Sequence, residues 1–475
     1  MSNSEEALQA RVKALEEEVV RLKAHLSGKS DAVQSGKGTT PASEAQENGQ
    51  GSKKGKGKRA FDFAAHPRRH VALRLAYLGW QYQGFAVQEN TDNTVEARVF
   101  EALLKTKLIQ DRQSSNYHRC GRTDKGVSAF SQVISIDLRS SQFSGLGVTI
   151  PKGVEPKAGG GAAVAELPYV KMLNRVLPPD IRALSWSPVH SGFSARFDCQ
   201  SRTYRYYFPR GNLDVELMSE AANRYEGTHD FRNLCKMDVG NGVLQFQRTI
   251  ASASVRLCDP SNLSSADPQE LYVFEVKGLA FLYHQVRCMM AILLLIGQKL
   301  EAPEIINQLL DVENNPRKPQ YSMAVDYPLV LYECDFDGLN WISESEEQSH
   351  VLSSLLQQWT QTAVKAQVLH GMIHGLQSTD TDKASVMNCC LMEGSKQRNY
   401  RPLLERPRCE SLESRIQHFV KRGRLEREEG ESGEEGSTVF RGKRSKHSHQ
   451  AGSTNQEDAE EENLKSLKDT PLRPL

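Results

Sequence analysis

The sequence predicts an α+β fold, and two observations lead to this class. Segments in which apolar and polar residues alternate, typical of half-buried strands, are mixed with segments of helical periodicity. These segments do not follow the regular strand–helix–strand repeat that a doubly wound parallel sheet requires. With 475 residues, the chain is long enough for two or three domains of about 150 residues each.

The first 60 residues are expected to be outside the globular part. Apolar residues between Leu8 and Leu26 are spaced alternately by four and three, which predicts a short coiled coil or a solitary helix. Residues 27–60 contain no aromatic side chain and are rich in Gly, Ser, Lys and Gln, which indicates a disordered linker. This linker ends in a basic cluster at 53–59.

The globular part is expected to begin near His70. Alternation predicts strands over 71–77, 134–138, 203–208 and 274–276, and helical spacing predicts helices over 95–103 and 281–300. Asn93 is placed to cap the first of these helices, with Glu96 at the third position of the helix.

The remaining segments have weaker patterns. Residues 140–165 are rich in Gly, Ser, Pro and Ala, and we expect them to form an inserted loop. Ordered structure is expected to fade after about residue 345, apart from a basic helical segment at 414–424.

The charges are distributed unevenly along the chain. The 60 Lys and Arg against 59 Asp and Glu give a net charge of +1, which taken whole argues against a nucleic-acid-binding protein. Residues 66–210, however, contain 20 basic and 11 acidic residues, whereas 211–345 contain 10 and 19, so the two blocks carry +9 and −9. The first block is basic enough to bind phosphates.

Three other classes of protein are disfavoured by simple features. The longest apolar run, from Met289 to Ile296, is far shorter than the roughly 20 residues of a membrane span, so no membrane partner is expected. The nine cysteines include no CxxC pair, and we expect reduced thiols and no structural zinc site. The N-terminus lacks the features of a signal peptide, and the basic clusters at 53–59 and 441–446 favour nuclear import, so a nuclear and cytoplasmic location is expected.

The segment 117–130 has the clearest chemical pattern. It contains a single carboxylate, Asp124, among the cations Arg119, Arg122 and Lys125. A carboxylate surrounded by cations keeps a low pKa and stays ionised, which suits a nucleophile or an electrostatic stabiliser. From spacing alone, an aspartate that only holds its loop together by ion pairs is the simpler interpretation.

Six segments in the same order resemble the TruA family of tRNA pseudouridine synthases. Cys120–Ala129, with the sequence CGRTDKGVSA, is similar to the signature loop of that family. The other five segments lie at 77–95, 173–181, 193–206, 227–231 and 281–287. The resemblance covers residues 70–335, and within the family the loop and residues 281–290 are most similar to the branch that acts at tRNA positions 38 and 39.

This resemblance implies a two-lobed pseudouridine synthase fold with mixed, mainly antiparallel sheets and a central cleft. The implied reaction converts uridine to pseudouridine in the tRNA anticodon stem-loop. In this reaction the base leaves the sugar, rotates and is rejoined to it through carbon. It needs neither a cofactor nor a metal. The implied partners are tRNA and a second copy of the chain in a homodimer.

The resemblance also implies roles for five residues. Asp124 and Arg287 would be the catalytic pair, with Arg287 pairing with Asp124 and keeping it ionised. Tyr204 would stack on the target uracil, Arg122 would enter the base stack as the uridine leaves it, and Leu329 would line the uracil pocket. From the residues alone, Tyr204 is also explained as a core tyrosine of its strand, and Arg287 as part of a surface ion pair.

Two positions depart from the family pattern. Ser128 stands where bacterial members usually have histidine, and 323–329 replaces their PPHGL-like segment. The assignment of a substrate contact at Ser128 therefore does not carry over.

Composition and resemblance together divide the chain into six parts. These are a helical segment (1–28), a basic disordered linker (29–65), an N-terminal catalytic lobe (66–200), a C-terminal catalytic lobe (201–345), a helical or irregular extension (346–425) and a disordered tail (426–475).

Two alternative functions stay open at this point. One is an RNA-binding protein or chaperone that has kept the fold without catalysis, and the presence of Arg122, Asp124, Tyr204 and Arg287 argues against it. The other is a hydrolase that uses Asp124, but the sequence places no second catalytic carboxylate near it.

Overall fold

The computed structural model describes residues 61–155, 165–259, 268–376, 383–394, 399–423, 425–427 and 438–440. The described residues from Phe61 onward form one compact unit. The predicted helix at 1–28, the linker up to residue 60 and most of the predicted tail lie outside the described residues.

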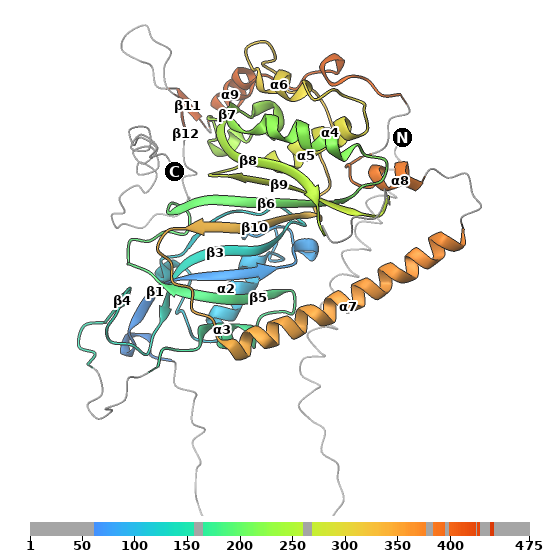
Figure 1. Cartoon of the computed structure of the whole chain (residues 1–475). Helices are drawn as coiled ribbons and strands as arrows, with labels where there is room; N and C mark the ends of the chain where they lie inside the picture. The colour runs from blue at the N-terminus through green and yellow to red at the C-terminus, as the bar shows by residue number, and fades with distance from the viewer. Residues whose placement is uncertain are drawn as a thin grey trace, which may run out of the picture. The chain divides into compact units, whose positions relative to one another are not determined.

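One mixed sheet of ten strands runs through this unit (Figure 1). The strand order is β4-β1-β3-β10-β6-β9-β8-β7, with β2 paired to β3 and β5 paired to β1. The strands are β1 (Arg68–Tyr77), β2 (His118–Arg119), β3 (Ser128–Arg139), β4 (Val148–Thr149), β5 (Ile181–Pro188), β6 (Cys199–Pro209), β7 (Gly227–Asp230), β8 (Gln247–Leu257), β9 (Leu271–Gly278) and β10 (Leu329–Phe336). A separate pair is formed by β11 (Leu425–Arg427) and β12 (Thr438–Phe440). The α+β class and the mixed, mainly antiparallel sheet are confirmed.

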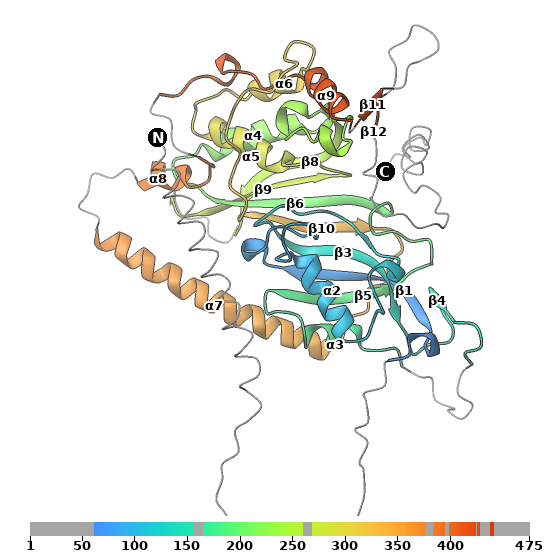
Figure 2. The same ribbon diagram turned by 180° about the vertical axis from the view of Figure 1, so that it is seen from behind.

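Helices accompany both halves of the sheet. They are α2 (Val95–Lys105), α3 (Tyr169–Asn174), α4 (Val215–Ala222), α5 (Gln285–Gly297), α6 (Ile305–Leu310), α7 (Ser345–Gly375), α8 (Lys383–Cys389) and α9 (Leu412–Lys421). In both views, α2 and α3 lie along the half that contains β1, β3 and β5, whereas α4 and α5 lie along the half that contains β8 and β9 (Figures 1 and 2). Every residue of α5 is buried, as expected for a helix that is apolar on all sides. Among the described helices, none is both long enough and apolar enough to cross a membrane.

Strand β10 joins the two halves of the sheet. Its Leu331 lies opposite Ala129 of β3 in a parallel pairing and opposite Tyr204 of β6 in an antiparallel pairing. The predicted lobe boundary at 200/201 falls within β6, so the two halves share a continuous sheet. The division into lobes stays a prediction, but the pairing explains how residues from distant segments come to one place.

The first predicted helix begins at Val95 as expected, but its cap is a different residue. Thr94 is its cap, because the Thr94 side-chain oxygen accepts a hydrogen bond from the Ala97 amide at 3.3 Å. The expected cap, Asn93, instead donates from Nδ2 to the Gln81 carbonyl at 2.7 Å. Its side chain is therefore engaged before the helix begins, and the expected Asn93 cap is wrong.

The expectation that order fades after residue 345 is also wrong. Residues Ser345–Gly375 form the long helix α7, whose first half contacts the body of the protein. Lys171 Nζ lies 3.2 Å from Glu346 Oε2, and Gln358 Nε2 donates to the Pro179 carbonyl at 3.3 Å. The helix has apolar residues at helical spacing, but most of them are exposed, so it packs only a few side chains against the body.

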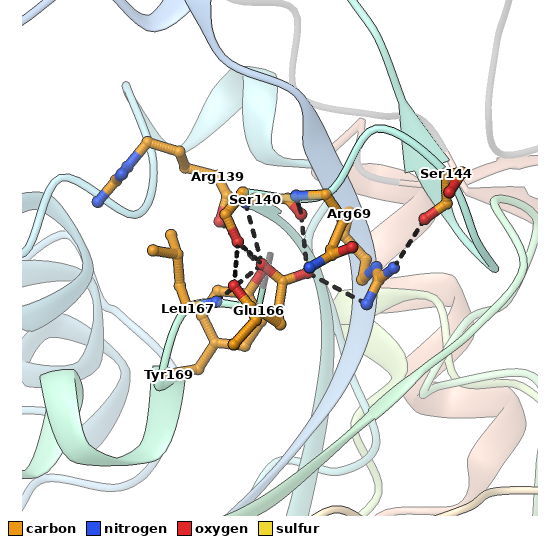
Figure 3. A network of polar contacts seen from close by, with 10 residues as sticks. Arg69, Arg139, Ser140, Ser144, Glu166, Leu167 and Tyr169 are labelled. Carbon is orange, nitrogen blue, oxygen red and sulfur yellow. Dashed lines mark hydrogen bonds and ion pairs between the residues drawn. The ribbon is translucent and has the colours of Figure 1, made fainter. Parts of the chain in front are cut away.

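The predicted insertion at 140–165 is tied to the sheet at its base. The Glu166 carboxylate accepts a hydrogen bond from Ser140 Oγ at 2.7 Å and pairs with Arg69 Nη1 at 3.1 Å (Figure 3). Arg69 also donates to the Ser144 carbonyl at 3.2 Å. Residues 156–164 of the insertion lie outside the described residues.

Candidate functional site

The loop between β2 and β3 carries Asp124, and hydrogen bonds fix the start of this loop to β3. The Cys120 amide donates to the Val133 carbonyl at 2.8 Å. The Gln132 side chain accepts from the Gly121 amide at 3.2 Å and donates to the Gly121 carbonyl at 3.0 Å. The backbone just before Asp124 therefore has little freedom.

Asp124 itself begins a tight turn. The Val127 amide donates to the Asp124 carbonyl at 3.2 Å, and Gly126 has a φ of 76°, which is the left-handed geometry that the third position of a type II turn requires. A Cβ at Gly126 would lie only 2.6 Å from Cγ of Asp326. Glycine at 126 thus allows both the turn and the close approach of a second carboxylate.

The cations of the loop do not surround Asp124 as expected. Arg119 Nη1 donates to Glu96 Oε1 at 2.8 Å, and Glu96 is only 1% exposed. The same carboxylate accepts hydrogen bonds from Arg112 Nη2 at 2.9 Å and from the Tyr117 hydroxyl at 2.7 Å. Arg119, which the sequence places near Asp124, therefore pairs with the buried Glu96 instead.

Burial raises the pKa of Asp124 to about 6. The Arg287 guanidinium opposes this rise, the Asp326 carboxylate adds to it, and the Lys236 ammonium opposes it. The predicted low pKa is wrong because the loss of solvation outweighs the attraction of the cations. With a pKa of about 6, the carboxyl is still ionised at neutral pH, but it is more basic than an ordinary aspartate.

Arg287 lies in the first turn of α5 and is 3% exposed. Its Nε donates to the Ala324 carbonyl at 2.8 Å, and its Nη2 forms an ion pair with the Glu393 carboxylate. The expected direct ion pair with Asp124 is not formed within the described residues. Residues next to Glu393 pair with 323–325, and this pairing brings the Glu393 carboxylate to the Arg287 guanidinium. The Arg287 charge therefore acts on Asp124 through space and not through a direct ion pair.

His284 is a neighbour of Asp124 that the sequence did not single out. Its Nε2 lies 3.8 Å from Asp124 Oδ2, which is too long for a hydrogen bond. Burial, together with the nearby Arg287 and Lys236 charges, lowers the pKa of His284 to about 3, so the ring is neutral at physiological pH. His284 is therefore a neutral side chain next to Asp124 and does not act as its counter-ion.

Tyr204 lies in the middle of β6, beside the other residues of the site. Its ring packs edge-to-face on Phe281, with 5.1 Å between the ring centroids and 79° between the planes. Burial raises the pKa of the Tyr204 phenol above its usual value, and the Asp124 charge raises it further. The structure thus places Asp124 within electrostatic range of Arg287 and of Tyr204, and the roles that the resemblance implies for them stay predictions.

The two remaining predicted residues have different surroundings. The Arg122 side chain is exposed, and its guanidinium has no hydrogen-bond or ion-pair partner in the part of the chain that the structure describes. Leu329 begins β10, is 4% exposed and lies opposite Tyr206. Leu331, two residues further along the same face, lies opposite Tyr204 and is the leucine nearer to it in register.

Several arginines of the basic block are engaged within the protein. Arg74 Nε donates to Ser131 Oγ at 2.7 Å, and Arg205 Nε lies 2.5 Å from Glu275 Oε2. The +9 charge of residues 66–210 therefore overstates the charge that is free to meet RNA.

One group of three side chains among the described residues has the spacing of metal ligands. It consists of Cys120, Cys199 and Cys334, and does not include Asp124.

Comparison with known proteins gives consistent matches. A family model described as tRNA pseudouridine synthase matches residues 221–337. The chain is 54% identical over 449 residues to tRNA pseudouridine(38/39) synthase from Homo sapiens, covering 89% of both chains. It is 54% identical over 444 residues to the protein of the same name from Mus musculus, covering 89% of this chain and 90% of the relative. The protein of that name from Saccharomyces cerevisiae is 44% identical over 303 residues, covering 62% and 64% of the two chains.

Proposed function

Because the chain belongs to the tRNA pseudouridine synthase family, we propose that it isomerises uridine to pseudouridine at positions 38 and 39 of the tRNA anticodon stem-loop. It is an isomerase, and its substrate class is tRNA. No observation favours the alternative of an inactive RNA-binding protein, since Asp124, Tyr204 and Arg287 are close together in the site.

The observation that carries this function is the placement of Asp124, a largely buried carboxylate at a tight turn with a pKa of about 6. The reaction breaks the bond between N1 of uracil and C1′ of ribose and forms a bond between C5 and C1′. A proton leaves C5 and a proton is gained at N1, so atoms and charge balance. Attack at the sugar, attack at the ring and removal of a sugar proton each require an ionised carboxylate. At pH 7 a carboxyl with this pKa is about 90% ionised.

Arg287 supports the ionised form of Asp124. Its guanidinium is the largest of the charges that lower the pKa of Asp124. We assign Arg287 to the catalytic pair on this ground, with the correction that it acts through space and not by a direct hydrogen bond. The carbonyl of Ala324 and the carboxylate of Glu393 hold the guanidinium in place.

Tyr204, Arg122 and Leu329 are proposed to bind the substrate. The contact with Phe281 holds the Tyr204 ring in position for stacking on uracil, and the raised pKa keeps the phenol neutral. Because the exposed Arg122 has no internal partner within the described residues, its guanidinium is available to take the place of the flipped uridine. Leu329 is proposed to line the uracil pocket from the start of β10.

A homodimer is also proposed, and α7 supports it. Leu352, Leu355, Leu356 and Trp359 are all exposed and lie on one stripe of the helix, whereas Gln358 contacts the body. An exposed apolar stripe of this kind suits a second copy of the chain as its partner. Light scattering is expected to give a dimer for the intact chain and a monomer for Trp359→Glu, whereas the control Gln357→Glu stays dimeric.

A nuclear and cytoplasmic location is proposed from the basic clusters at 53–59 and 441–446. Fluorescence microscopy of the full chain, compared with a variant in which both clusters are neutral, tests this location. Equal nuclear signal for the two proteins would contradict it.

The function is tested with a tRNA transcript that carries tritium at C5 of uridine. The intact chain is expected to release tritium into water, and transcripts in which uridines 38 and 39 are both replaced are expected to release none. Tritium release from the replaced transcript would contradict the proposed positions. If the tRNA bound without any tritium release, the inactive RNA-binding alternative would be favoured, and release of free uracil would favour the hydrolase.

A further inference from the structure

Three cysteines that are far apart in the sequence meet in the core. Cys120, Cys199 and Cys334 are 4%, 3% and 7% exposed, and their sulfur atoms all lie within 4.8 Å of one another. We propose that they bind one soft closed-shell cation, Zn²⁺ or Cu⁺, through three thiolates.

The choice of cation follows from the ligands. Thiolates are soft ligands that select zinc and monovalent copper over magnesium, calcium and manganese. Zinc–sulfur bonds of about 2.3 Å place the sulfurs of a tetrahedral site about 3.8 Å apart. The three cysteines supply three of its four ligands, and a water molecule would supply the fourth. Side-chain movements of about 1 Å or less would therefore bring the three sulfurs from their present spacing to that of a bound cation.

The surroundings of the sulfurs suit a negatively charged site. Arg202 Nη2 donates to the Cys120 carbonyl at 2.8 Å, which places the guanidinium beside the cluster. Three thiolates and a divalent cation carry a net charge of −1, which the Arg202 guanidinium offsets. Binding of the cation releases the thiol protons of the three cysteines to solvent.

The location of the ligands indicates what the cation does. Cys120 belongs to the loop that carries Asp124, Cys199 begins the strand that carries Tyr204, and Cys334 lies on the strand that Leu329 begins. β6 and β10 are already paired, with Cys334 opposite Arg202. A cation held by all three cysteines would fix the catalytic loop to this strand pair. Its role is therefore structural.

The sequence-based expectation of no structural zinc site rested on the absence of a CxxC pair. That criterion finds ligands that are neighbours in the sequence, whereas here each ligand comes from a different element of the sheet. Two alternative roles for the cluster predict no metal binding: the cysteines pack as small apolar residues, or a pair of them forms a disulfide under oxidising conditions.

The test uses the full chain, stripped of metal and kept reduced. Cobalt(II) serves as the spectroscopic probe for the zinc site, and copper(I) is titrated separately against a chromophoric chelator. We expect the chain to bind one equivalent of Co²⁺, with intense thiolate-to-metal absorption that added Zn²⁺ abolishes, or to bind one equivalent of Cu⁺. Binding of neither ion to the reduced chain at micromolar concentration would overturn the proposal.

Variants locate the site. Cys199→Ser is expected to weaken metal binding at least tenfold, whereas the control Cys258→Ser, at a partly exposed cysteine outside the cluster, binds as the intact chain does. Equal binding by Cys199→Ser would overturn the proposal. X-ray absorption of the metal-loaded intact chain gives an independent result that does not depend on a variant folding. Sulfur ligands at about 2.3 Å support the site, and nitrogen or oxygen ligands alone contradict it.

Discussion

Replacing Asp124 by asparagine is expected to abolish isomerisation and at the same time to stabilise the fold. The pKa of Asp124 is about 6 in the folded protein, against an ordinary value of 3.8. The fold therefore favours the neutral carboxyl, and ionising this group in the folded state costs free energy that the unfolded chain does not spend. Asparagine has the same shape and never ionises, so it removes that cost.

The size and the pH dependence of the gain follow from the two pKa values. Below about pH 3 the carboxyl is neutral in both the folded and the unfolded state, and asparagine adds little to the free energy of unfolding. The gain in the free energy of unfolding increases as pH rises from about 4 to 6 and then levels off. Each tenfold difference in the acid constants corresponds to about 1.4 kcal/mol, which gives about 1.5 kcal/mol at pH 5 and about 3 kcal/mol at pH 7.

Urea denaturation of the intact chain and Asp124→Asn at pH 5 and pH 7.5 measures this difference. The matched control is Asp214→Asn, at the cap of α4, where the carboxyl accepts a hydrogen bond from the Leu217 amide at 3.1 Å and has a lowered pKa. The control is expected to gain no stability at either pH. If Asp124→Asn gained nothing, or gained equally at both pH values, the assignment of a buried, destabilised carboxylate would be refuted.

Three other substitutions test the site from different sides. Glu393→Gln leaves the Arg287 charge unpaired, so the pKa of Asp124 should fall. Single-turnover rates should then persist to lower pH. An unchanged acid limb of the pH–rate profile would contradict the expected fall in the pKa. Arg122→Ala should weaken tRNA binding and reduce the slope of log affinity against log salt by about 1, with an unchanged melting temperature, because its guanidinium has no partner in the described part of the protein. Glu96→Gln should cost about 3 kcal/mol in urea denaturation, because two arginines lose a buried partner; a loss below 1 kcal/mol would mean that this carboxylate does not anchor the loop.

The parts of the fold with strong periodicity could be predicted from the sequence. The alternation at 71–77 corresponds to β1 (Arg68–Tyr77), and the apolar segment at 281–300 contains α5 (Gln285–Gly297). The long helix α7 lies in the segment expected to be a helical or irregular extension, but its length was not predicted, because its apolar side chains are mostly exposed and few contacts hold it to the body.

The site could be predicted only in part, because its residues come from distant segments. The signature loop identified Asp124, and the family pattern identified Tyr204 and Arg287. The partners that determine their electrostatics, Asp326 and Glu393, are far from them along the chain and belong to no local motif. The sequence also placed cations around Asp124, and it could not show that a buried glutamate takes one of them.

Mapping of pseudouridine by carbodiimide-dependent reverse-transcription stops tests the proposed reaction and its catalytic residue together. An unmodified tRNA transcript is incubated with the intact chain or with Asp124→Ala, and tRNA binding is measured in parallel. We expect stops that report positions 38 and 39 with the intact chain, and none with Asp124→Ala although it still binds tRNA. Pseudouridine formed equally well by Asp124→Ala would contradict the catalytic role of this carboxylate.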